Sequence, residues 1–197
     1  MTGPTPPGAP WARAQGGPPA PGSPLDEQLA AFVGPRWNVY RRKFAPFFDD
    51  ARFQPTWNWA AALLSPGWFL YRKLYVPFVF FAFVPTVAFG LLWGDRPPAQ
   101  PLPTPGAPIP EELRDAMVLM LGVYLSTSIL AGGTANFLLF RRATAALALL
   151  APREADQGAR LAVLRRVGGV SWASVAVGIG VLLVLQAVLG AAAGSAG

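Results

Sequence analysis

Three long apolar stretches, at residues 75–93, 117–140 and 170–189, dominate the pattern of this chain, and none of them contains a charged residue or a histidine. A helix rises about 1.5 Å per residue, so even the shortest stretch would extend roughly 28 Å, close to the thickness of the hydrocarbon core of a bilayer. A helix also satisfies its own backbone hydrogen bonds, as a spanning segment must. The pattern predicts an all-α membrane protein with three transmembrane helices.

A short cytoplasmic helix is predicted before the spans. Ser23 and Pro24 form a helix start, and Asp26 and Glu27 place acids in the first turn, where the helix dipole favours them. Gly34 and the proline after it should end the helix.

The next segment has an aromatic stripe at helical spacing and a basic face. The stripe consists of Trp37, Tyr40, Phe44, Phe47 and Phe48. Arg41, Arg42 and Lys43 fall on the other face, which predicts a helix lying at the bilayer interface with its cations near anionic headgroups. Pro46 should end or kink this helix. The alternative is that the stripe packs against the rest of the protein.

Residues 56–75 are rich in aromatic side chains. The apolar run 59–64 is too short to cross a membrane, so we expect an interfacial or shallow re-entrant helix followed by a turn or helix start at Ser65. An aromatic belt at headgroup depth would comprise Trp57, Trp59, Trp68, Tyr71 and Tyr75. Arg72 and Lys73 would extend toward the headgroups.

These two segments predict a lipid-binding platform. Its members are Trp37, Arg41, Arg42, Lys43, Phe44, Trp57, Trp59, Trp68, Arg72 and Lys73. A sharper alternative is a pocket in which Asn58 and the cations hold an anion, with the indoles giving cation–π support. Both readings make membrane lipids of an anionic leaflet the expected partner.

Small and polar residues interrupt the second and third apolar stretches. Those predicted to pack helices together are Ser128, Gly132, Asn136, Ser174 and Gly178. Small residues let helices approach closely, and we expect Asn136 to be buried and hydrogen-bonded to another span. A permeation path through this polar band is the alternative, but ion paths usually need charge or exposed carbonyl groups.

Basic residues alternate along the chain. Eight Lys and Arg residues precede the first span, two lie between the first and second, six lie between the second and third, and none follows. Because Lys and Arg accumulate on the cytoplasmic side, this predicts a multi-pass protein of the cell (inner) membrane with a cytoplasmic N-terminus and an outside C-terminus.

The chain is therefore divided into a disordered Pro/Gly-rich tail at 1–24, a cytoplasmic and interfacial helical module at 25–74, and a transmembrane domain at 75–197. The outer connection, 94–116, has seven prolines between positions 97 and 110 and should be extended. The basic inner connection, 141–169, should include a short helix within 153–166.

Composition excludes much chemistry. The chain has no Cys and no His, which excludes thiol chemistry and Ser-His or Cys-His nucleophile pairs, and no cofactor or metal is expected. The +6 net charge is explained by orientation and an anionic leaflet, so nucleic acid is not an expected partner.

Three functions were weighed. The first is a non-enzymatic accessory, assembly or envelope-maintenance factor that acts through protein or lipid interaction, as a homo-oligomer or within a larger membrane complex. The second is a small oligomeric transporter or channel. An enzyme acting on lipid headgroups comes third, because the acids near the interfaces show no metal-binding spacing.

Several segments resemble a known family. They are FVGPRWNVYRRKFAPF, WNWAAALLSPGWFLYRKLY, GGTANFLLFRR and VGGVSWASV, between Phe32 and Val175. The combination is similar to the small bacterial inner-membrane proteins that form domain of unknown function 2628. The resemblance implies a membrane protein but no particular chemistry. Many relatives carry a Cys-rich zinc ribbon before this region, and this chain has a Pro/Gly-rich segment there instead.

Overall fold

The computed structural model describes residues 17–49, 52–93, 108–151 and 156–194, and within them every regular element is a helix. The helices are α1 (Pro24–Val33), α2 (Trp37–Asp49), α3 (Trp59–Leu64), α4 (Gly67–Tyr71), α5 (Tyr75–Trp93), α6 (Glu111–Leu150), α7 (Gln157–Val167) and α8 (Trp172–Gly194). Most of the predicted tail and of the predicted outer connection lies outside the described residues. The predicted all-α class is confirmed for the part of the chain that the structure describes.

Helix α1 begins and ends where the sequence predicts. The Ser23 side chain accepts a hydrogen bond from the backbone N–H of Asp26, and Gly34 ends the helix with φ of 88°. The end of α1 packs against the end of α7, where the Gly169 N–H donates to the Phe32 carbonyl at 2.6 Å. A Cβ on Gly168 would lie 2.2 Å from the same oxygen, so this contact requires a glycine.

Helix α2 continues through Pro46 and buries its aromatic stripe in the protein core. Trp37 is 6% exposed and Phe44 is fully buried, with the Phe44 ring centroid 5.3 Å from that of Phe140 on α6. The prediction that Trp37 and Phe44 contact lipid is therefore wrong, and the packing alternative is correct. The reason is that α6 supplies an apolar surface that covers the whole stripe.

Helices α3 and α4 form a short helical hairpin whose turn is Ser65–Pro66. Helix α3 packs on α6, and α4 packs on α8 and α5. Asn58 caps the start of α3 by accepting a hydrogen bond from the Ala61 N–H. Because α3 has only six residues, its position depends on these tertiary contacts rather than on its own helical stability.

Helix α6 is 40 residues long and contains the predicted second span within it. Its buried residues begin at Ala131, apart from Ala116, and continue to Leu147. The helix runs without interruption through Arg141 and Arg142, where the sequence suggested that an inner connection begins. This second half of α6 packs against α1, α2 and α7.

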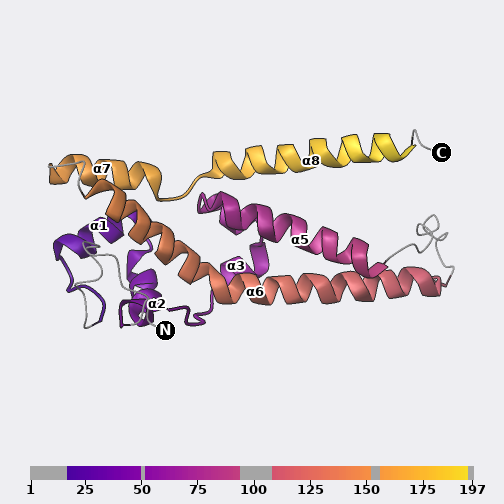
Figure 1. Cartoon of the computed structure of the whole chain (residues 1–197), viewed down its shortest axis with the longest axis horizontal. Coiled ribbons are helices and arrows are strands. Elements are labelled where there is room, and N and C mark those ends of the chain that lie inside the picture. The colour runs from indigo at the N-terminus through magenta and orange to yellow at the C-terminus, as the bar shows by residue number, and fades with distance from the viewer. Residues whose placement is uncertain (1–16, 50–51, 94–107, 152–155, 195–197) are drawn as a thin grey trace.

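The apolar helices extend together to one side of the molecule. Figure 1 shows α5, α8 and the first half of α6 running away from the cluster formed by α1, α2 and α7. Helix α5 packs along α6, whereas α8 is joined to the rest mainly through α4.

Two helical stretches, Glu111–Leu150 and Gln157–Val184, are long and apolar enough to cross a membrane. Three were expected, but the first expected span, Tyr75–Phe89 in this count, is an apolar helix that falls short of that length. Only 17% and 11% of the most apolar segments of the two longer stretches are buried inside the protein. Core helices of soluble proteins bury such segments, so this exposed apolar surface needs another apolar environment.

Candidate functional site

Two asparagines attach the α3–α4 hairpin to α6. The Asn58 side-chain amide donates to Asn136 Oδ1 at 2.8 Å, and Asn136 Nδ2 donates to the Thr56 carbonyl at 3.0 Å. With Asn58 Oδ1 capping α3, both ends of both amides have partners. Asn136 is fully buried, as predicted, but it bonds the segment leading into the hairpin rather than another span. Asn58 is committed to this pair and is not the anion ligand that the pocket alternative assigned to it.

Two glycines allow the hairpin to approach its neighbours. A Cβ on Gly132 would lie 2.9 Å from the Ala62 Cβ, and a Cβ on Gly178 would lie 2.2 Å from a methyl group of Leu70. Of the predicted helix-packing set, Gly132, Asn136 and Gly178 therefore contact the hairpin. Ser128 is only partly buried.

The starts of α5 and α8 and the middle of α6 lie at one level. The Tyr75 hydroxyl shares a hydrogen bond of 3.2 Å with Ser174 Oγ, and the Arg142 guanidinium lies 5.9 Å from the centre of the Tyr75 ring. Partial burial lowers the pKa of Arg142, and the neighbouring Tyr75 acts in the opposite direction. Lys73 donates to the Arg166 carbonyl at this end of the helices.

Arg72 is the most unusual side chain at this level. It is 5% exposed, donates to the Val33 carbonyl at 2.8 Å and lies 4.7 Å from the centre of the Tyr40 ring. Its Nε atom is buried without a hydrogen-bond partner. No carboxylate among the described residues forms a salt bridge with it, since the one ion pair there joins Arg41 and Asp26. The expectation that Arg72 extends toward headgroups is wrong, because α1 and α2 cover it.

Arg72 lines a cavity of about 550 Å³ between the start of α2, the hairpin and α8. Its polar lining consists of Arg36, Tyr40, Tyr71 and Arg72. Its apolar lining consists of Val33, Pro35, Ala60, Leu64, Gly67, Trp68, Val170, Trp172 and Val175. The cavity is thus amphipathic, with two cations and, among the residues that line it, no acid.

The other predicted cations bind within the protein or face outward. Arg41 pairs with Asp26 at 3.5 Å and donates to the Pro19 carbonyl, and Lys43 donates to the Trp57 carbonyl at 3.0 Å. Arg42 is exposed. The Arg41, Arg42 and Lys43 cluster is therefore not one continuous surface.

The predicted aromatic belt is divided in the same way. Trp59 is 68% exposed and Trp57 is 38% exposed, whereas Trp68 is buried. Trp172, which the sequence analysis did not select, is 73% exposed, and its ring centroid lies 5.0 Å from that of Tyr71. The exposed members surround the hairpin and the start of α8.

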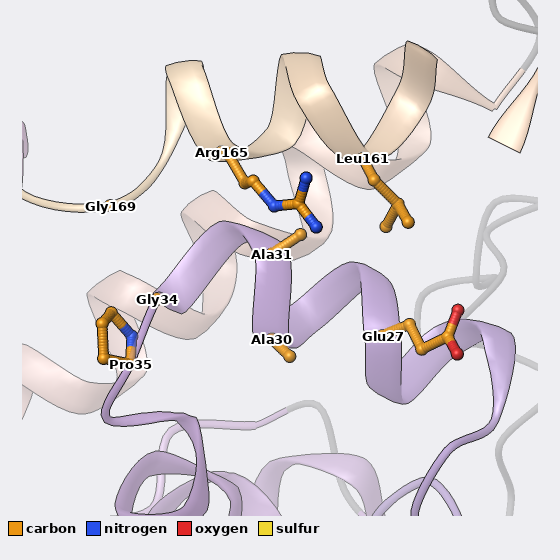
Figure 2. Close-up of a pocket in the computed structure, with 8 residues that line it drawn as sticks. All are labelled: Glu27, Ala30, Ala31, Gly34, Pro35, Leu161, Arg165 and Gly169. Carbon is orange, nitrogen blue, oxygen red and sulfur yellow. The ribbon is translucent and has the colours of Figure 1, made fainter. Parts of the chain in front are cut away.

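A second cavity, of about 770 Å³, lies between α1 and α7. Figure 2 shows Arg165 and Leu161 extending from α7 toward Ala31 of α1, with Glu27 at the far end. Glu27 accepts a hydrogen bond from the Gln157 side chain. This cavity therefore has charges of both signs on its lining.

Arg36 and Tyr40 were not identified as site residues from the sequence. Arg36 looked like one more cation for orientation, and Tyr40 like one member of the stripe; only the YxxxxR-type pairing of segments distant in sequence brings Tyr40 to Arg72. No cluster of three or more Asp or Glu residues that could hold a metal ion occurs in the described parts of the chain. The arrangement is suited to binding an amphiphilic anion.

Comparison with protein families gives a match to a family described as protein of unknown function (DUF2628), over residues 36–145. The chain belongs to this family. The resemblance noted in the sequence is thereby confirmed. No curated protein and no solved structure matches the chain.

The DUF2628 match begins at Arg36 and ends in the second half of α6. It therefore contains the hairpin, Arg72, Tyr40 and the Asn58–Asn136 pair. Helices α1, α7 and α8 lie outside the matched residues. The hairpin and the helix that holds it form the centre of the family match.

Proposed function

We propose that this protein is a non-enzymatic, multi-pass protein of the cell membrane that acts through interactions at its cytoplasmic face. The observation that carries the proposal is the exposed apolar surface of α5, α8 and the first half of α6, next to a cluster of cations where these helices meet the module. Lipid chains would cover this apolar surface.

Three spans remain the best assignment. Helix α5 has 19 residues without a charge, which corresponds to about 28 Å, and it starts at the same level as α8. Exposed Trp59, Tyr75 and Trp172 near that level fit an aromatic belt. With the basic residues inside, the N-terminus is cytoplasmic and the C-terminus is outside.

In this placement the α3–α4 hairpin is re-entrant. It starts at Asn136, and the Leu63 carbonyl near its turn accepts from the Tyr124 hydroxyl at 3.5 Å. Tyr124 precedes Asn136 by 12 residues, or about 18 Å along α6. Exposed Leu63 and Leu64 at the turn would then contact lipid chains.

An oligomeric transporter has less support. In the described part of α6, the hydroxyls of Ser126, Thr127 and Thr134 donate to carbonyls of their own helix four residues earlier. Asn136 is used to hold the hairpin. An accessory or assembly role, alone or in a larger complex, agrees better with side chains that serve packing.

Reporter fusions at Gln100, Gln157 and Gly197 test the topology. We expect an outside reporter at Gln100 and Gly197 and a cytoplasmic reporter at Gln157. A cytoplasmic signal at Gln100 would contradict the three-span assignment.

Single-cysteine labelling tests the hairpin, because the chain has no cysteine of its own. Leu63→Cys should resist a membrane-impermeant maleimide from both sides, whereas Arg42→Cys should react from the cytoplasmic side only. Rapid labelling of Leu63→Cys in intact membranes would show that the hairpin lies in water.

A further inference from the structure

We propose that the cavity between α2, the hairpin and α8 binds the phosphate of one anionic phospholipid, with Arg72 and Arg36 as its cations and the apolar wall as the seat of an acyl chain. This inference uses the membrane placement proposed above. It adds a specific ligand class and a specific site, which that placement does not require.

The first argument is the buried charge of Arg72. Removing a guanidinium from water is costly unless it is paired and hydrogen-bonded. The Val33 carbonyl and the Tyr40 ring give Arg72 partial compensation, but neither carries a net charge. The unpartnered Nε leaves one donor available, and no described carboxylate pairs with the guanidinium. An anion in the cavity would supply the missing charge.

The second argument is the chemistry of the lining. Arg36 and Arg72 make the polar end of the cavity doubly positive, and the Tyr40 and Tyr71 side chains also line it. Arginine forms bidentate hydrogen bonds with phosphate oxygens. A zwitterionic lipid would bring an ammonium group close to these cations, so the site should prefer a lipid with a net negative charge.

The third argument is position. The Ser171 N–H donates to the Tyr71 carbonyl at 2.9 Å, which places the end of α4 at the start of α8. The polar lining is therefore at the level where the apolar helices begin, and Leu64, Trp68 and Val175 line the cavity as well. A headgroup and its acyl chain have the same polarity order along the membrane normal.

The cavity between α1 and α7 does not meet these conditions. Glu27 lines it together with Arg165, so the cation there already has an acid nearby (Figure 2). Arg165 is exposed, unlike Arg72. That cavity gives no reason to expect an anion.

The test uses the full chain in a mild detergent, where the diffuse potential of a bilayer is absent. Native mass spectrometry would compare binding of phosphatidylglycerol and phosphatidylcholine with matched acyl chains. We expect one bound phosphatidylglycerol, held at least about tenfold more tightly, which is the effect of about one charge-assisted hydrogen bond. Equal affinity for the two lipids would overturn the proposal.

Variants locate the site. Arg72→Gln should remove the preference, and Arg36→Gln, on an exposed side chain that leaves the fold intact, should reduce it about threefold. Val175→Trp should block binding by filling the apolar end. The matched control is Arg42→Gln, an exposed cation of α2 that does not line the cavity, and it should leave affinity unchanged. An equal loss in Arg42→Gln and Arg36→Gln would mean diffuse attraction and would overturn the site.

Inorganic phosphate distinguishes a free anion from a lipid. If phosphate alone displaced phosphatidylglycerol from the wild-type chain at equal concentration, the lipid assignment would be wrong. Reporter fusions that give the proposed topology together with absent lipid selectivity would reject this inference while leaving the proposed function in place.

Discussion

The two halves of α6 differ in surroundings although both are largely apolar. In residues 111–130 the large aliphatic side chains are mostly exposed, whereas in residues 131–150 the buried positions recur about every four residues from Ala131 to Leu147. The second half presents small side chains such as Gly132 and Ala135 where the hairpin approaches, and Leu139 and Phe140 where α2 packs. The first half has bulky side chains on all sides and no protein layer around it.

The difference shows how one helix serves two environments. Against lipid there is no hydrophobic gain from helix association, so contacts there depend on small residues and hydrogen bonds. Gly132 and Asn136 provide both at the point where the hairpin attaches. Beyond Arg142 the packing partners are α1 and α7, and burial from water becomes the dominant stabilising term.

The largest effect should come from removing an aromatic side chain in the second half. Phe140 is 3% exposed and contacts Phe44, Phe47 and Phe48, so Phe140→Ala should lower the free energy of unfolding by about 3–5 kcal/mol. Leu121→Ala, at a 57% exposed position of the first half, should change it by about 0.5 kcal/mol or less. Thermal unfolding in detergent measures both. Equal losses would remove the distinction between the two halves.

Next in size is the glycine at the hairpin contact. Gly132→Leu inserts a side chain against Ala62 and Trp57 and should destabilise the protein by about 1–3 kcal/mol. Its neighbour is the matched control, because a Cβ on Gly133 meets no atom within 4 Å, and Gly133→Leu should have a small effect. Cysteine labelling at Leu63 in the Gly132→Leu background would show whether the hairpin has separated from α6. A stable Gly132→Leu variant with a protected Leu63→Cys would contradict the close approach.

The asparagine pair should have a smaller effect. Asn136→Leu leaves the Asn58 amide without its acceptor, which costs about 1–3 kcal/mol for a buried group, although interhelical hydrogen bonds in membranes average about 0.6 kcal/mol. We therefore expect a loss of about 1–2 kcal/mol. A double-mutant cycle with Asn58→Ala should give a coupling energy of at least about 0.5 kcal/mol, since the two side chains are in contact. Additive losses would mean that the pair does not act together.

Sequence patterns predicted the helices better than their partners. The caps at Ser23 and Gly34 are local features, and the burial of Asn136 follows from the cost of an unpaired amide among apolar residues. The faces of α2 could not be assigned, because an aromatic stripe suits both lipid and a protein core, and the deciding partner, Phe140, is distant in the sequence. Arg72 and Lys73 look equivalent in the sequence, yet α1 and α2 cover only Arg72. Hydropathy alone also does not distinguish the lipid-facing half of α6 from its protein-facing half.

The smallest effect is expected from the hydroxyls in the first half of α6. Ser126 and Thr127 donate to the carbonyls of Gly122 and Val123 in their own helix, at 2.8 Å and 2.7 Å. Such bonds duplicate what the helix backbone already has, so Ser126→Ala and Thr127→Val should change the free energy of unfolding by no more than about 0.5 kcal/mol. A transport path lined by these hydroxyls would make a different demand, because their removal would then alter flux without altering stability. Unfolding and a flux assay in vesicles should therefore be measured on the same two variants, with Asn136→Leu as the destabilised reference. Unchanged values in both assays would leave the first half of α6 as a lipid-facing span, while a loss of flux in stable variants would favour the transporter over the interaction role.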